Sequence, residues 1–229
     1  MSFHRPEEPP FLSIDRDQPH VPYITTDQMR EVDRIMVEEY GIQLLQMMEH
    51  AGRNLAHLAR RRFLEGDPGG RKVLVLTGTG GNGGGGLVCA RRLHSWDAAV
   101  EVWVTAQVAD EEVTLPAANL IVDSLIGCSL RGAPQETTAA LIRAANGPGR
   151  TDSCAGCSQW HRLHEPAIRA AATLTLALPK QGFRSEAARE RIGELYLGDI
   201  GVPPGLYGRA PLGLDVGPIF AREEIVRLW

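Results

Sequence analysis

Apolar runs and helical patterns alternate along the chain, and their order predicts its fold. Residues 73–76 read Val-Leu-Val-Leu, and a run without polar positions is typical of a strand buried on both faces of a parallel sheet. Further segments of strand character are 99–106, 120–122, 172–178 and, as an edge strand, 195–201. Strands separated by helical segments predict an α/β fold with a mostly parallel central sheet and helices on both faces.

Apolar positions at helical spacing predict two helices before the first strand. The first has a capping box at Thr25 and Gln28 and runs to about Tyr40. Its apolar stripe consists of Met29, Val32, Ile35 and Met36. The second starts near Ile42, and the residues that we expect it to turn toward the core are Leu44, Leu45, Met48, Leu55 and Leu58.

The later connections are uneven in length. Residues 137–145 predict a helix and residues 186–194 a charged helix or turn. The segment 107–118 is so short that it holds one small helix at most. Residues 1–22 carry many prolines and charges and predict a flexible arm, which leaves 23–229 as a single domain. Residues 225–229 read as a tail.

A glycine-rich stretch at residues 78–86 directly follows the first strand. Glycine lets bare backbone approach a ligand, and we expect the stretch to form a loop ahead of a helix with an apolar face at Leu87, Val88, Ala90 and Leu93. Loop N–H groups and a helix N-terminus would then point at one spot suited to a phosphate. The alternative is a flexible linker, but linkers are seldom flanked by a buried strand and an amphipathic helix.

Composition narrows the class of protein. The chain has 229 residues and a formal net charge of -4, which does not favour a nucleic-acid surface. No apolar stretch approaches the ~18 residues of a membrane span, and the start lacks the apolar core of a signal peptide, so a cytoplasmic protein without membrane contact is expected. The four cysteines do not resemble a secreted disulfide framework.

Three polar residues are candidates for function. Asp123 ends the predicted strand at 120–122, and the carboxyl end of a strand lies at the rim where open α/β sheets bind ligands. The alternative is a carboxylate that caps the following turn. Glu49 and His50 lie within the second helix, and a functional role and a solvated or capping role are both open for them.

Several motifs in order resemble the YjeF N-terminal family, the NAD(P)H-hydrate epimerases. Residues 47–52 are similar to its Leu-Met-Glu-Asn-Ala-Gly, residues 80–87 to its Gly-Asn-Asn-Gly-Gly-Asp-Gly-Leu, and residues 122–127 to its Val-Asp-Ala-Leu-Leu-Gly. Residues 169–180 and 198–203 resemble its closing strands. The resemblance covers roughly residues 24 to 228.

The resemblance implies a Rossmann-like sandwich, often a homodimer, that interconverts the R and S forms of hydrated NADH or NADPH so that a dehydratase can repair both. It implies a potassium ion held by Asn82 and Asp123. It also implies a dinucleotide site lined by Asn82, Gly83, Gly84, Gly85, Gly127, Cys128, Ser129, Leu130, Arg131, Gly132 and Ala133. A carboxylate and an amide oxygen suit a hard cation.

The chain departs from the family pattern in the glycine stretch and in one missing motif. Gly81 and Gly85 replace an Asn and an Asp. The family's Asp-Val-Pro-Ser-Gly-Leu/Ile-Asp, whose first Asp is its acid/base, is absent between 146 and 172, so the sequence names no catalytic residue. A non-catalytic nucleotide-binding or scaffold module is therefore the alternative function.

Residues 150–164 stand where the motif belongs. Their cysteines and histidines, Cys154, Cys157, His161 and His164, do not have a zinc-finger spacing, although a metal or redox site is a third possibility. Permitted codons for residues 156–163, GGA TGT TCC CAG TGG CAT CGA CTG, read one base later as Asp-Val-Pro-Ser-Gly-Ile-Asp. We hypothesise that this segment is translated out of frame and expect a loop in place of a packed central strand.

Overall fold

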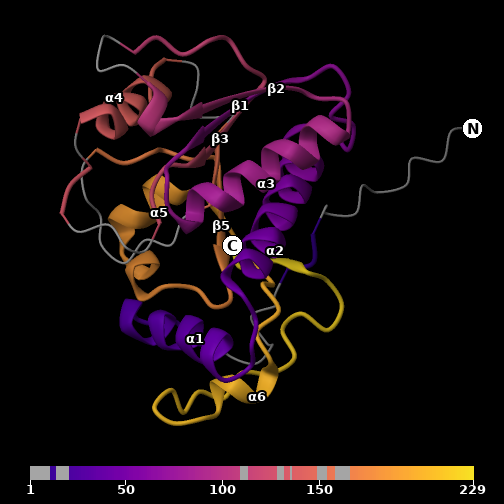
Figure 1. The fold of residues 1–229 in the computed structure, drawn as a ribbon, viewed down its shortest axis with the longest axis vertical. Coiled ribbons are helices and arrows are strands. Elements are labelled where there is room, and N and C mark those ends of the chain that lie inside the picture. The colour runs from indigo at the N-terminus through magenta and orange to yellow at the C-terminus, as the bar shows by residue number, and fades with distance from the viewer. Residues whose placement is uncertain are drawn as a thin grey trace, which may run out of the picture.

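The computed structural model describes residues 11–13, 21–108, 113–127, 132–134, 136–148, 154–157 and 166–229, with the backbone alone for 154–157. Within these residues a seven-stranded sheet has the order β2-β1-β3-β4-β5-β6-β7 (Figure 1). The strands are β1 Lys72–Thr77, β2 Ala99–Val104, β3 Leu120–Ser124, β4 Cys154–Cys157, β5 Ala172–Leu176, β6 Glu194–Gly198 and β7 Ile225–Arg227. Neighbours pair in parallel except β6 and β7.

Helices cover both faces of this sheet, as the sequence predicts (Figure 1). The helices are α1 Thr26–Glu38, α2 Leu44–Leu58, α3 Gly81–Ser95, α4 Glu136–Ala145, α5 Glu186–Ile192 and α6 Pro204–Tyr207. Val73 and Val75 of β1 face the core shared with α1, α2 and α3, whereas Leu74 and Leu76 face the core shared with α4. Alternate side chains of one strand thus build two cores, which explains why the strand has no polar position.

The first helix forms as predicted. The Thr25 hydroxyl accepts a hydrogen bond from the Gln28 N–H at 3.1 Å, and the Gln28 side chain accepts one from the Thr25 N–H at 2.9 Å. The predicted apolar stripe is buried, namely Met29, Val32, Ile35 and Met36. Both the capping box and the packed face therefore favour this helix.

The start of α2 differs from the prediction. This helix begins at Leu44, two residues later than expected, and Leu44 and Leu45 are 53% and 73% exposed. The first turn of α2 lies outside the core, and burial begins with Met47 and continues through Leu55 and Leu58. A helical period alone does not show where along a helix the packing starts.

The glycine stretch is largely helix, so the predicted loop is wrong. Helix α3 begins at Gly81. The glycines in it allow its backbone to pack closely against neighbouring strands. A Cβ at Gly83 would lie 1.8 Å from the Gly78 carbonyl oxygen, and one at Gly86 would lie 1.8 Å from Ser124 Oγ. The predicted apolar face is partly wrong as well, since Leu87 is exposed.

Two further strand predictions are corrected by long-range pairing. Strand β6 is not an edge, because β7, the predicted tail, pairs with it antiparallel through Leu197 and Val226. Residues 154–157 form the central strand β4, which pairs with β3 and β5, so the sheet does not lack this strand. The bridge after β2 holds a single 3₁₀ turn, Thr105–Gln107, in its described part.

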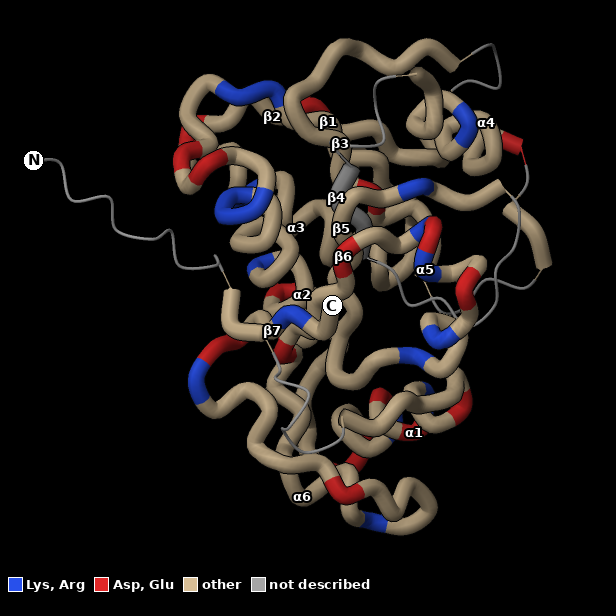
Figure 2. Tube along the Cα trace, turned by 180° about the vertical axis from the view of Figure 1, so that it is seen from behind, with Lys and Arg blue, Asp and Glu red and all other residues tan. Residues whose placement is uncertain are grey.

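The described part of the N-terminal segment is anchored to the sheet. The Phe11 ring packs edge-on against Tyr196 with ring centroids 5.1 Å apart, and the Arg227 N–H donates to the Leu12 carbonyl oxygen at 2.8 Å. Lys and Arg are interspersed with Asp and Glu along the described chain (Figure 2). No helix among the described residues has the length and apolarity required to span a membrane.

Candidate functional site

A pocket lies at the carboxyl ends of the central strands, next to α1, α2 and the start of α3. It encloses about 160 Å³ and is lined by residues of these three helices, by Leu125 and Gly127 after β3, by Leu176 of β5 and by Ile200 after β6. Pockets that bind whole drug-sized ligands measure ~300–1,000 Å³, so this smaller pocket suits one ring of a larger ligand. Its position matches the general rule that open α/β sheets bind ligands beyond the carboxyl ends of their strands.

The N-terminus of α3 forms one wall of the pocket. Gly80 is the N-cap, and the first helical hydrogen bond runs from the Gly84 N–H to the Gly80 carbonyl oxygen at 3.0 Å. The N–H groups of Gly81, Asn82 and Gly83 precede that bond and have no acceptor within the helix. The predicted anion site thus has its donors on the pocket wall, supplied by a helix turn rather than a loop.

Buried hydroxyls hold this helix turn in place. Thr77 Oγ1, at the end of β1, donates to the Gly83 carbonyl oxygen at 2.9 Å. Ser124 Oγ, at the end of β3, donates to the Leu76 carbonyl oxygen at 3.0 Å and occupies the space where a Cβ at position 86 would lie. The hydrogen bond from Thr77 thus ties the first turn of α3 to β1, and Gly86 in the next turn packs against Ser124 of β3.

Asn82 connects α3 to the segment that follows β3. Its Nδ2 donates to the Ile126 carbonyl oxygen at 2.9 Å, which leaves Oδ1 outside that bond. A Cβ at Gly127 would lie 3.2 Å from the Asn82 Cβ, so glycine permits the close approach of this segment. The two predicted site segments are thus brought together.

Asp123 lies at the end of β3 and is buried. Its Oδ1 accepts the Leu125 N–H at 3.0 Å, which is the turn-capping role that the sequence left open. Burial raises the pKa of Asp123 to about 6, partly offset by this hydrogen bond. Asp123 is not among the residues that line the pocket, although Leu125 and Gly127, which follow it, are.

The donor chemistry of Asn82 and Asp123 fits a potassium ion. The Asn82 amide oxygen and the Asp123 carboxylate are both hard ligands. The carboxylate is buried and forms no ion pair with any of the described residues. The described residues contain no group of three or more His, Cys, Asp or Glu side chains placed to hold a metal. A monovalent ion does not require such a group, because neutral oxygens can complete its shell.

The other predicted site residues divide into three groups. Asn82, Gly83, Gly85 and Gly127 line the pocket. Gly84 faces α2 instead, since a Cβ there would lie 2.7 Å from Met48 Sδ, and Gly132 and Ala133 are not among the lining residues. The remaining predicted residues, Cys128, Ser129, Leu130 and Arg131, lie outside the described residues.

Sequence reasoning missed Asp33, which lines the pocket from α1. Its spacing carried a signal, because Asp33 lies four residues after Met29 and three before Met36, within the apolar stripe. Burial raises the pKa of Asp33 to about 6, and the charge of Lys180 acts in the opposite direction. Lys180 itself is buried, with Nζ donating to the Leu176 and Leu178 carbonyl oxygens at 2.6 and 2.8 Å.

The structure answers the question left open for Glu49 but not the one left open for His50. Glu49 accepts hydrogen bonds from Arg91 and, at 2.9 Å, from Arg92, so it joins α2 to α3. Met48, which the sequence predicted to face the core, lines the pocket together with Met47. The buried Nδ1 of His50 has no hydrogen-bond partner among the described residues, and the His50 ring lies against Gly201.

The segment of the missing motif lies beside Asp123. In the β3–β4 register Asp123 is opposite Gly156, the position at which the shifted frame encodes the first Asp of the motif. The backbone of Cys154 and Cys157 belongs to β4, whereas His161 and His164 lie outside the described residues. The structure therefore leaves the predicted Cys/His site untested and places the motif's position next to the candidate cation ligand.

Comparisons with known proteins identify the family. A family model described as YjeF-related protein N-terminus matches residues 44–115. The chain is 39% identical to the NAD(P)H-hydrate epimerase of Dehalogenimonas lykanthroporepellens, covering 90% of this chain and 92% of that protein. It is 30% identical to the NAD(P)H-hydrate epimerase of Rhodopirellula baltica, covering 80% and 86% respectively.

Larger relatives and a solved structure agree with this. The chain is 30% identical to the bifunctional NAD(P)H-hydrate repair enzyme Nnr of Moorella thermoacetica but spans only 41% of it. The crystal structure of yeast ynu0, YNL200c, superposes with a TM-score of 0.70 at 21% identity, covering 91% of this chain and 100% of that one, which supports the fold. The chain belongs to the YjeF N-terminal family.

Proposed function

We propose that this chain is an NAD(P)H-hydrate epimerase. One observation carries the proposal: the first turn of α3 and the segment after β3 line one pocket at the carboxyl edge of the sheet. The chain that forms this pocket is 39% identical, over nearly its whole length, to an enzyme of that name. The N–H groups at the start of α3, which have no acceptor within the helix, suit the diphosphate of the dinucleotide, and the enclosed part of the pocket suits its hydrated ring.

The chemistry of the substrate defines what the site has to do. The reduced nicotinamide ring is an enamine, so water adds its proton to a ring carbon and its hydroxyl to the carbon bonded to nitrogen. That carbon is a hemiaminal, whose configuration inverts when one of its bonds to a heteroatom breaks and forms again. A group that accepts and returns a proton is therefore sufficient, and such a group typically contributes ~10²–10⁴-fold.

Potassium is the ion that we propose for the pair Asn82 and Asp123. The Asn82 Oδ1 and the carboxylate of Asp123 would hold it. When bound, the ion would offset the charge of the diphosphate and of the buried carboxylate. The chain's own residues do the positioning, since the Asn82 side chain ties α3 to the Ile126 carbonyl oxygen.

A dehydratase specific for the S form is the functional partner that we propose. The bifunctional relative from Moorella thermoacetica is named as an NAD(P)H-hydrate repair enzyme, and the present chain spans 41% of it. Substrate passed between two such activities would be hydrated NADH or NADPH. The expected homodimer stays a prediction.

The non-catalytic module remains the second candidate, since Gly81 and Gly85 replace polar residues of the family and the acid/base motif is missing. The test is an assay in which the R hydrate of NADH is incubated with the purified chain and an S-specific dehydratase. Conversion of the R hydrate well above the spontaneous rate is the expected result. Retention of the R hydrate by folded protein would leave only the binding module.

A further inference from the structure

Asp33 is the one titratable side chain among the described residues that line the pocket. The other lining residues are glycine, alanine, leucine, isoleucine, methionine and Asn82. Among the described lining residues, Asp33 is therefore the one group that can accept a proton from a bound substrate and return it.

The Asp33 carboxylate is available for this. No hydrogen bond or ion pair to it is present within the described part of the chain. Other acidic residues of α1 are engaged at the surface, for example Glu31, which accepts from Arg34 at 2.7 Å. Asp33 instead occupies the apolar face of the helix, on which Met29 also lines the pocket.

The surroundings of Asp33 support a proton-exchanging role. Loss of solvent raises the pKa of Asp33 to about 6. A general acid/base works best when its pKa lies near the pH of the reaction, and this shift brings the carboxyl group closer to neutral pH. The buried ammonium of Lys180 opposes this rise and favours the ionised form. The Tyr207 hydroxyl is buried and has no hydrogen-bond partner in the part of the chain that the structure describes. Its pKa is raised by burial and by the charges of Asp199 and Asp33.

We propose that Asp33 is the catalytic carboxylate of this pocket, taking the acid/base role for which this chain lacks the family's motif. The proposal rests on the proposed epimerase function. It assigns a role to a residue of α1, far in sequence from the glycine stretch, that the tertiary structure alone brings to the site.

The step balances with one carboxylate. Asp33 takes the proton of the ring hydroxyl, the bond between that carbon and the ring nitrogen breaks with its electron pair going to nitrogen, and the carboxyl group returns the proton to that nitrogen. An aldehyde results. Rotation about its bond to the next carbon exposes the opposite face, and reversal of the same transfers closes the ring with inverted configuration and leaves Asp33 ionised.

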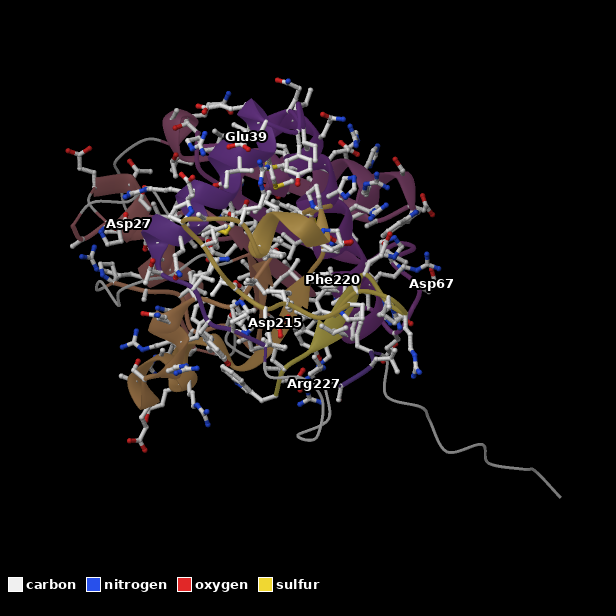
Figure 3. All side chains as sticks on the ribbon, turned by 90° about the horizontal axis from the view of Figure 1, so that it is seen from below. Asp27, Glu39, Asp67, Asp215, Phe220 and Arg227 are labelled. Atoms are coloured by element: carbon white, nitrogen blue, oxygen red, sulfur yellow. The ribbon has the colours of Figure 1, made fainter. Side chains whose placement is uncertain are left out.

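The test compares Asp33→Asn with Asp27→Asn. Both residues lie on α1, but the Asp27 side chain is 89% exposed and pairs only with Arg30 in the described structure; Figure 3 shows Asp27 near one end of this helix and Glu39 near the other. The rate of conversion of the R hydrate is measured with dehydratase in excess, with the spontaneous rate subtracted. We expect Asp33→Asn to lower kcat by about 10²–10⁴-fold with KM changed by less than about 3-fold, and Asp27→Asn to change neither.

The outcomes separate the two proposals. An active natural chain with an equally active Asp33→Asn variant would overturn the role of Asp33 and leave the epimerase standing. An inactive natural chain would overturn both. Asp33→Ser, measured in parallel with thermal melting of all variants, gives the same comparison if the asparagine variant does not fold.

Discussion

The Asn82 side chain donates a hydrogen bond to the Ile126 carbonyl oxygen at 2.9 Å and so joins the first turn of α3 to the segment after β3. Asn82→Ala removes this link from the pocket wall. We expect an unfolding free energy lower by about 1 kcal/mol and a clear loss of epimerase activity. Urea unfolding and the coupled assay measure the two effects.

Asn119→Ala is the matched control. The Asn119 side chain accepts the Lys72 N–H at 2.8 Å at the opposite end of the sheet. Its loss should cost a similar free energy while leaving activity unchanged. Equal activity of the Asn82 variant and the natural chain would contradict a role for Asn82 at the site.

Two neighbouring glycines of α3 should respond in opposite ways to alanine. A Cβ at Gly86 would meet Ser124 Oγ at 1.8 Å, whereas one at Gly85 would meet Ala51 Cβ at an ordinary 3.6 Å. We expect Gly86→Ala to lower the unfolding free energy by about 1–3 kcal/mol and Gly85→Ala to raise it by up to ~1 kcal/mol, because alanine favours the helix. Thermal melting decides this, and a similar effect of both would mean that α3 does not pack as described.

The buried carboxyl of Asp123 should make stability depend on pH. Its folded pKa of about 6 lies above its ordinary value of 3.8, so the folded state holds the proton more tightly than the unfolded state. The resulting stability is complete below the unfolded pKa and is lost as the pH rises through about 6. At ~1.4 kcal/mol per unit, the loss is about 3 kcal/mol at pH 8 without a counter-ion, and Asp123→Asn should recover it.

Potassium provides the second half of this prediction. An ion bound to the folded state stabilises it, so KCl should raise the midpoint of urea unfolding of the natural chain at pH 8 relative to choline chloride. Asp123→Asn should show no such difference. The same response of both proteins would argue against a potassium site at Asp123.

Restoring the shifted frame tests the hypothesis on residues 150–164. Replacing residues 156–162 with Asp-Val-Pro-Ser-Gly-Ile-Asp places an aspartate on β4 opposite Asp123. We expect epimerase activity to rise by about 10²-fold or more if the family's acid/base is thereby regained. Unchanged activity in a folded protein would show that this segment is not a displaced form of the motif.

The same chain with Asp33→Asn distinguishes two routes to activity. If the restored aspartate takes over proton exchange, the effect of Asp33→Asn should be smaller in the restored chain than in the natural one. If Asp33 serves both chains, its substitution should lower kcat by a similar factor in each. A double-mutant cycle on kcat measures the difference.

The sequence by itself determined the α/β class, the capped first helix, most strands, and the family, because these depend on local periodicity and on motifs in order. It also indicated that Asn82 and Gly127 belong to one site, and both line the pocket. It did not show that the glycine stretch is helix, since a glycine run looks the same whether its bare backbone meets a ligand or, as at Gly83 and Gly86, the backbone and side chains of neighbouring strands.

Only the tertiary structure decided the remaining features. Strand β7 and the strand character of residues 154–157 depend on pairing with distant partners, which outweighs weak local preference. Asp33 was not a candidate from the sequence, and only the folded chain shows that it lines the pocket at the carboxyl ends of β3 and β5. Desolvation and the field of Lys180 then set its pKa, and both arise from residues far away in the chain.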